Sequence, residues 1–197
     1  MESIVDLTGS ASRTLDLENA ARLLRFEYLG RVPAEEAVAL AELPFLGGSR
    51  RGRISNYLRR VEGGETMALL DFSYGRGSGR HEETVASLES PRLAVADFAV
   101  RPERTVDRLI PLIGHGDIDF DGNPVFSHRY LLRGREEAAV RALFTRERLA
   151  AFEDVEPCAV AGAGRRLIYF EPDHLVWPGA LDAFLARASR IFDLFRR

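Results

Sequence analysis

The chain has 197 residues, of which 46% are hydrophobic and 29% are charged. This composition is typical of one globular domain and argues against a disordered chain. Its 30 acidic residues exceed its 27 basic ones, and the net charge of -3 excludes the strongly basic character of a typical nucleic-acid-binding domain. Every basic residue is an arginine, which we interpret as a compositional bias of the genome.

The sequence predicts a protein of the cytoplasm. Cys158 is the only cysteine, so an intrachain disulfide is excluded, which fits a reducing compartment. Residues 1–6 show no basic segment followed by an apolar run, and we therefore expect no signal peptide. No stretch approaches 18 uninterrupted apolar residues, so no membrane span is expected either.

The first part of the chain is expected to contain two short helices. Residues 1–15 are small and polar and predict a flexible arm. Asp16 is a suitable N-cap for a helix that ends near Leu24, because apolar residues then recur on one face. A proline, which favours a first helical turn, precedes a second helix over residues 34–40. Residues 26–29 fit either a continuation of the first helix or an extended segment.

The middle of the chain predicts an antiparallel meander. Beyond residue 52 the period of the hydrophobic pattern changes from about 3.6 to about 2, which is the period of a strand. Clusters of glycine between the apolar runs are typical of tight turns. Strands are predicted at residues 53–61, 66–74, 82–88 and 92–100, with a turn at 62–65 and a hairpin tip at 75–79.

The second part of the chain mixes strands and helices. The last helix is the clearest element, because its apolar residues recur at the i, i+3, i+4 and i+7 spacing of one helix face. We expect a connector over 101–113, a strand over 125–133, a helix over 136–153, a hairpin over 157–171 and the last helix over 178–196.

Together these elements predict a single α+β domain over residues 1–197, with the arm at 1–15. Its centre is expected to be a largely antiparallel sheet of about six to eight strands. Helices at the N-terminus, at 136–153 and at 178–196 are expected to cover one face of this sheet. The alternative is a pair of sheets divided near residues 101–116.

The densest group of potential metal ligands follows the connector. If this segment is extended, its alternate side chains point to one face, while Ile118 and Phe120 point to the core. Carboxylate-rich sets of this kind suit Mg²⁺, Mn²⁺ or Ca²⁺. The candidate metal ligands are His115, Asp117, Asp119 and Asp121.

Other interpretations of the acidic segment stay open. Alternate residues on a strand lie about 6.6–7 Å apart, so one ion can be shared by two neighbours of the set and not by all four. Arg129 or Arg133 on adjacent strands could neutralise the carboxylates instead. The spacing from Asp117 matches the start of an EF-hand loop, but the final glutamate is replaced by His128, which excludes an EF-hand. The simpler interpretation is a solvated strand face that leads into a turn at 121–124.

No other motif indicates a specific chemistry. The glycines at 75–79 lack the spacing of a phosphate loop and predict a hairpin tip. Cys158 lies in a predicted strand without the features of a reactive thiol, and we interpret it as a core residue. A basic group in the first half is interpreted as a solvated face or a docking surface for an acidic partner. It comprises Arg50, Arg51, Arg53, Arg59 and Arg60.

A series of short motifs follows in order between residues 53 and 145. They are Leu70-Asp71-Phe72-Ser73-Tyr74, Thr84-Val85, Arg101-Pro102-Glu103, Asp117-Ile118-Asp119-Phe120, Phe126-Ser127-x-x-Tyr130 and Val140-Arg141-x-x-Phe144-Thr145. In this order they resemble an uncharacterised bacterial protein family without assigned activity. The resemblance implies that these segments form one unit, and it implies no catalytic residues.

The function expected from the sequence is binding rather than catalysis. The chain shows no recognisable nucleophile motif, cofactor loop or complete metal set. We therefore expect a non-enzymatic domain without a cofactor that binds a partner protein or a small ligand. The alternative is a metal-dependent hydrolase or metal-regulated binder that uses Mg²⁺, Mn²⁺ or Ca²⁺ at the acidic segment of residues 115–121.

Overall fold

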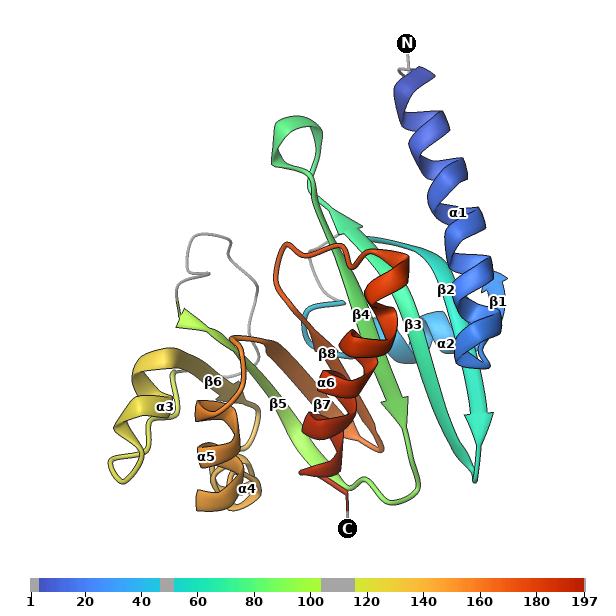
Figure 1. Ribbon diagram of the computed structural model, residues 1–197. Helices are drawn as coiled ribbons and strands as arrows, with labels where there is room; N and C mark the ends of the chain where they lie inside the picture. Colours follow the sequence, from blue (N-terminus) through green and yellow to red (C-terminus); the bar gives the residue numbers. More distant parts are fainter. Residues whose placement is uncertain (1–3, 47–51, 104–115, 197) are drawn as a thin grey trace.

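A computed structural model describes residues 4–46, 52–103 and 116–196, and the side chains of these residues except 4–11 and 78. Within this part of the chain, eight strands form one antiparallel sheet in the order β1-β2-β3-β4-β8-β7-β5-β6 (Figure 1). The strands are β1 (Glu27–Gly30), β2 (Arg53–Glu62), β3 (Glu65–Tyr74), β4 (His81–Glu89), β5 (Val95–Pro102), β6 (Tyr130–Gly134), β7 (Ala159–Gly164) and β8 (Arg166–Phe170).

Helices lie on both faces of the sheet. Figure 1 shows α6 across the front of the strands and α2 behind them. The helices are α1 (Ile4–Leu24), α2 (Ala34–Ala41), α3 (Pro124–Arg129), α4 (Glu137–Leu143), α5 (Arg146–Glu153) and α6 (Leu181–Asp193), with 3-10 turns η1 (Gly77–Gly79) and η3 (Pro178–Ala180).

Each face of the sheet has its own hydrophobic core. The larger core joins side chains of α1, α3, α4, α5 and α6, such as Leu17, Phe126 and Phe184, to one face. The smaller core joins Leu40 of α2 and Phe45 to the other face. Strand β3 is therefore buried on both sides, as its continuous apolar sequence predicts. The predicted α+β class and the antiparallel sheet are confirmed, and the alternative of two sheets is wrong for the described strands.

Two strands from the end of the chain separate β4 from β5 in the sheet. Strands β2, β3 and β4 pair in chain order, as predicted, through the turn at Gly63 and Gly64. Strand β4 then pairs with β8 instead of β5, and β7 pairs with β5. The hairpin of β7 and β8 therefore lies between β4 and β5 in the sheet. Pairing between segments this far apart follows from shared burial and not from a local turn.

Two predictions about helices need correction. The segment expected as an arm at 1–15 is helical from Ile4, twelve residues before the predicted start at Asp16. It contains no proline, and Arg13 of this segment is held by contacts with the sheet that are described below. The predicted helix at 136–153 is divided into α4 and α5. The division lies at Thr145, whose hydroxyl accepts a hydrogen bond from the backbone N–H of Arg148 and caps α5.

The predicted strand at 125–133 is also wrong in its first half. Pro124 occupies the first turn of α3, where its fixed backbone angle favours a helix, and the helix continues to Arg129. Strand β6 therefore begins only at Tyr130, where pairing with β5 starts. This short helix forms one wall of the cavity described in the next section.

Candidate functional site

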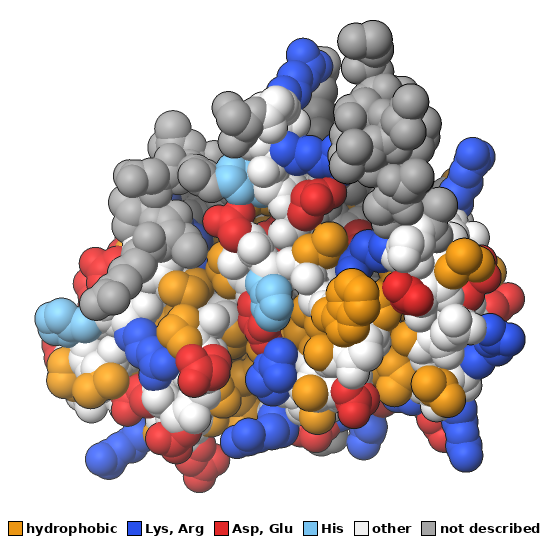
Figure 2. All heavy atoms as spheres, turned by 45° about the horizontal axis from the view of Figure 1, so that its top comes forward, with side chains coloured by type: hydrophobic (Ala, Val, Ile, Leu, Met, Phe, Trp, Pro, Cys, Tyr) orange, Lys and Arg blue, Asp and Glu red, His pale blue; other side chains and the backbone are white. Residues whose placement is uncertain are grey.

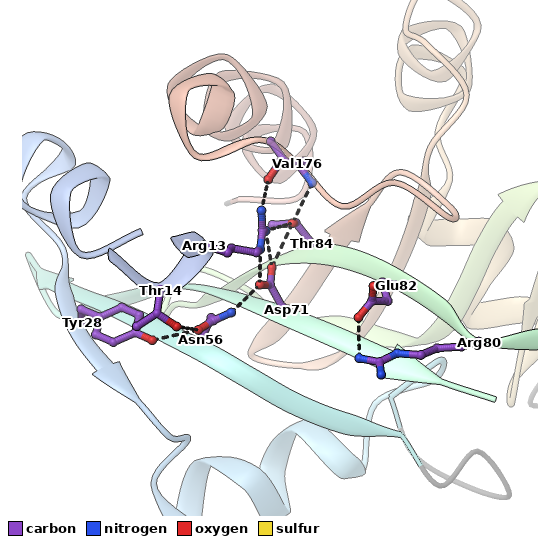
Figure 3. Close-up of polar contacts among 9 residues, drawn as sticks. All are labelled: Arg13, Thr14, Tyr28, Asn56, Asp71, Arg80, Glu82, Thr84 and Val176. Atoms are coloured by element: carbon purple, nitrogen blue, oxygen red, sulfur yellow. Dashed lines mark hydrogen bonds and ion pairs between the residues drawn. The ribbon is translucent and has the colours of Figure 1, made fainter. Parts of the chain in front are cut away.

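Asp71 is the centre of the main polar network. It lies in the middle of β3 and is 8% exposed, between strands β2 and β4. Among the described residues, its carboxylate accepts hydrogen bonds from Arg13 Nε and Nη2, both at 2.8 Å (Figure 3). It also accepts one from Asn56 Nδ2 at 2.8 Å and one from Thr84 Oγ1 at 3.2 Å. The buried negative charge is thus paired with a guanidinium in a bidentate geometry.

The network fixes α1 and the segment before α6 to the sheet. Arg13 Nη1 donates to the backbone oxygen of Val176 at 2.9 Å, and the N–H of Val176 donates to Thr84 Oγ1 at 3.0 Å. Asn56 has a positive φ of 51° at a bulge in β2, and Tyr28 donates to its side-chain oxygen at 2.8 Å. Each of these polar groups is used to connect elements. We therefore interpret the network as a structural joint.

The acidic segment lies along the outer edge of β6. Asp117 Oδ1 accepts from the backbone N–H groups of Ile118 at 3.0 Å and Leu132 at 2.8 Å. The N–H of Ile118 donates in turn to the oxygen of Leu132 at 2.8 Å. Burial raises the pKa of Asp117, and the nearby Asp119 charge adds to this effect. Asp117 thereby occupies backbone groups of an edge strand that would otherwise be open to pairing.

The expected extended strand does not form in this segment. Residues 117–120 have no regular secondary structure, because the N–H of Phe120 donates to Ser127 Oγ at 2.9 Å and the chain turns into α3. Ile118 is buried and Phe120 packs against the same core, as predicted. The residues Asp117, Asp119 and Asp121 are all exposed, and only the carboxylate of Asp117 is partly covered by its backbone contacts.

The metal hypothesis stays a prediction. His115 lies outside the described residues, so the set of four cannot be assessed as a whole. Among the described residues, no three His, Cys, Asp or Glu side chains are grouped as a metal site would require. The hypothesis can be tested by the melting temperature in Mg²⁺, Mn²⁺ or Ca²⁺ against chelator, because an ion that binds the folded state stabilises it.

The remaining candidates have structural roles. Cys158 is fully buried, which confirms a core residue, and this burial raises the pKa of its thiol to about 12. Arg59 pairs with Glu27 at 3.2 Å, and the Arg60 guanidinium lies 4.8 Å from the centre of the Phe26 ring. Arg50 and Arg51 lie outside the described residues. Figure 2 shows acidic and basic side chains interspersed on one face, with hydrophobic side chains between them.

A cavity of about 800 Å³ lies beside β5 and α3. Most of its walls are apolar, and three of the residues that line it are prolines. Val125 is 55% exposed, whereas its neighbour Phe126 is fully buried against Tyr130 and Phe152. This cavity, which we call the proline groove, is lined by Pro102, Glu103, Pro124, Val125, His128, Arg129 and Pro157.

Hydrogen bonds hold the walls of the proline groove in place. Arg129 Nη2 donates to the backbone oxygen of Val155 at 2.7 Å, which ties α3 to the segment before β7. His128 Nδ1 donates to the backbone oxygen of Pro124 at 2.7 Å. The N–H of Phe126 donates to Glu153 Oε1 at 3.1 Å. The walls are therefore fixed by contacts within the chain.

Only weak signals of these features are present in the sequence. A single aspartate inside the apolar run of β3 is a signal that Asp71 is buried and paired. No spacing in the sequence indicated that Arg13 would be its partner. The prolines of the groove are far apart in the chain, and only the pairing of β5 with β6 and β7 brings them together.

Comparisons with known proteins show the fold. No protein-family model matches the chain, and no curated protein matches it. A similar solved structure is the crystal structure of the mycobacterial trehalose monomycolate transport factor A, TtfA, with a TM-score of 0.63. The match covers 93% of this chain and 94% of that chain at 15% sequence identity. At this identity the likeness shows a shared α+β fold over nearly the whole length.

In the part of the chain that the structure describes, no helix is both long enough and apolar enough to cross a membrane.

Proposed function

We propose that this chain is a non-enzymatic binding domain that holds an apolar segment of a partner protein in the proline groove. The observation that carries the proposal is the cavity of about 800 Å³ with mainly apolar walls beside β5 and α3. A cavity of this size and character is the usual place for a bound group.

The composition of the proline groove fits an apolar polypeptide segment. Pro102, Pro124 and Pro157 have no backbone N–H, so covering them leaves no main-chain donor unpaired. Val125 offers an exposed apolar side chain that a partner can bury. Glu103 and His128 add polar groups to the lining, and an apolar centre with a polar rim is typical of protein interfaces.

The side chains that could act in catalysis are engaged in contacts within the chain or are buried, which also favours binding over catalysis. Asp71 is paired with Arg13, Asp117 accepts from backbone groups, and the Cys158 thiol is held in its neutral form by burial. A catalytic acid, base or nucleophile must reach a substrate. The similar solved structure is named a transport factor, which is compatible with a non-enzymatic role.

The proposal is tested by selection of short random peptides, displayed on phage, against the purified chain. We expect enriched peptides to carry apolar side chains. Calorimetry should show that Val125→Asp weakens their binding by about tenfold or more, because a buried unpaired carboxylate costs well over 1.4 kcal/mol.

The matched control is Val38→Asp, since Val38 is 64% exposed on α2 and lies on the other face of the sheet. This variant should bind the peptides like the unmodified chain. Failure to enrich any peptide, or equal loss of binding in the two variants, would contradict the proposal. Binding of a fatty acid probe in place of every peptide would also contradict it.

A further inference from the structure

A cavity of about 290 Å³ lies between the end of α5 and α6, on the side of the sheet with the larger core (Figure 1). It shares only Arg129 with the proline groove. Its volume is at the lower end of the range for small-molecule sites, about 300–1,000 Å³, which suits a ligand as small as one amino acid. We call it the α6 pocket, and it is lined by residues 153–156, Arg129, Tyr169, Arg187, Arg190 and Ile191.

The α6 pocket has two walls of different charge. One wall, formed by residues 153–156, carries three carboxylates, and the other carries Arg187 and Arg190 one turn apart on α6. Arg129 lies in the acidic wall, where it donates to two backbone oxygens at 2.5 and 2.7 Å. Its single charge offsets only part of the three carboxylates, so this wall stays acidic.

The charges of the two walls do not pair with each other. Arg187 pairs instead with Glu171, which is not part of the lining, at 2.7 Å, and Arg190 has no ion-pair partner among the described residues. The three lining carboxylates form no ion pair with described residues either, and only Glu153 accepts a hydrogen bond, from the N–H of Phe126.

This separation of charge differs from the rest of the surface. Elsewhere in the described chain, exposed arginines pair with nearby carboxylates at 2.6–3.2 Å. In the α6 pocket, unpaired groups of both signs instead border one cavity. A ligand that carries both a negative and a positive group could therefore pair with each wall at once.

The rest of the lining is apolar. Ile191 is buried, Val155 is half-buried, and both pack against the larger core. The hydroxyl of Tyr169 already donates to Glu171 at 3.0 Å, so it is used within the chain. An apolar group of a ligand can thus be covered between the two charged walls.

We propose that the α6 pocket binds a zwitterionic α-amino acid with an apolar side chain. The carboxylate of this ligand pairs with Arg190 beside Arg187, and its ammonium group pairs with the carboxylates of residues 153–156. Its side chain contacts Val155 and Ile191. This inference does not depend on the function proposed for the proline groove.

The arrangement of charges disfavours other classes of ligand. A simple anion that pairs with the guanidiniums of α6 meets the carboxylates of the opposite wall, and a simple cation meets the guanidiniums. An uncharged apolar molecule takes charged groups out of water without pairing them, which is unfavourable. A zwitterion offsets both sets of charges.

The test is calorimetric titration of the full chain with leucine and with two analogues that each lack one charge, isoamylamine and isocaproate. Leucine should bind, and each analogue should bind about tenfold more weakly, because one charge-assisted contact is lost. In NMR spectra of the isotopically labelled chain, leucine should shift the backbone signals of residues 154–156 and 187–191. The signal of Val125 should stay in place, which separates this site from the proline groove.

Arg190→Gln removes a guanidinium from the α6 wall and should weaken leucine binding by about tenfold. The same variant should not weaken isoamylamine binding, because that ligand has no carboxylate. The matched control is Arg146→Gln, since Arg146 is exposed on α5 and does not line the pocket. Both substitutions are at exposed positions, so both variants should fold.

Three results would overturn the proposal. One is that isoamylamine or isocaproate binds as tightly as leucine, and another is that Arg190→Gln binds leucine like Arg146→Gln. The third is an absence of leucine binding at millimolar concentration, which would mean that the charged groups of the pocket are simply solvated.

Discussion

Replacing Arg13 by alanine removes the cation that pairs with the Asp71 carboxylate. The side chains of Arg13 and Asp71 are 16% and 11% exposed, so the pair lies close to the protein interior. Removing one partner of such a pair costs about 3–5 kcal/mol, because the other charge is left buried and unpaired. In a domain of this size each kcal/mol lowers the melting temperature by about 2–4 °C. Urea unfolding followed by far-UV circular dichroism measures the loss.

The structure provides a matched control on the same helix. Arg22 is exposed on α1 and bonds only to the nearby Asn19 among the described residues, so Arg22→Ala should change stability by less than about 0.5 kcal/mol. Replacing both partners, as Arg13→Met with Asp71→Leu, should recover part of the loss because no charge stays buried. A cost for Arg13→Ala close to that for Arg22→Ala would refute the interpretation of the network as a structural joint.

Further predictions concern the acidic segment, the pH dependence and the thiol. Asp117→Ala should cost about 1 kcal/mol in urea unfolding, because the backbone N–H of Leu132 loses its acceptor while the N–H of Ile118 keeps the oxygen of Leu132, whereas Asp119→Asn should be near neutral. Burial opposes ionisation of Glu65 and Glu171, but hydrogen bonds from Ser90 and Arg187 among others lower the pKa of each carboxyl. The two ionised carboxylates therefore stabilise the fold fully above the unfolded pKa of about 4.3, and this stabilisation should be lost as pH falls through the folded pKa. A melting temperature that stayed constant as the pH was lowered from 4 would contradict this. Cys158 should resist a thiol reagent at pH 8 and react on unfolding, and rapid reaction of the native chain would show that the thiol is accessible.

The elements with strong local patterns were predictable from the sequence. Helix α6 follows the spacing of one apolar face, and Phe184, Ala188 and Ile191 are buried as expected. Strands β2 and β3 follow from the change of the hydrophobic pattern to a period of about 2 and from the Gly63-Gly64 turn between them. In these segments the local propensity and the tertiary packing favour the same structure.

The errors in the prediction of α1 and α3 have different physical causes. Helix α1 is longer than its apolar pattern, and one of its contacts with the sheet is an ion pair between Arg13 and Asp71, 58 residues apart. Helix α3 replaces the start of a strand because Pro124 favours a helical turn there. Both depend on contacts or backbone preferences that hydrophobic periodicity does not include.

The candidate sites were less predictable than the fold. The proline groove is assembled from segments far apart in the chain. A single sequence contains residue types but not the strand order that brings these residues together.

The most direct test of the account is to locate a selected peptide on the chain by NMR. Titration into the isotopically labelled chain should shift the backbone signals of Val125, His128 and Arg129 in α3, with smaller changes at the end of β5. Signals of α2 around Val38 should stay in place. Shifts centred on α2, or shifts spread evenly over the sheet, would contradict the claim that the proline groove is the docking site.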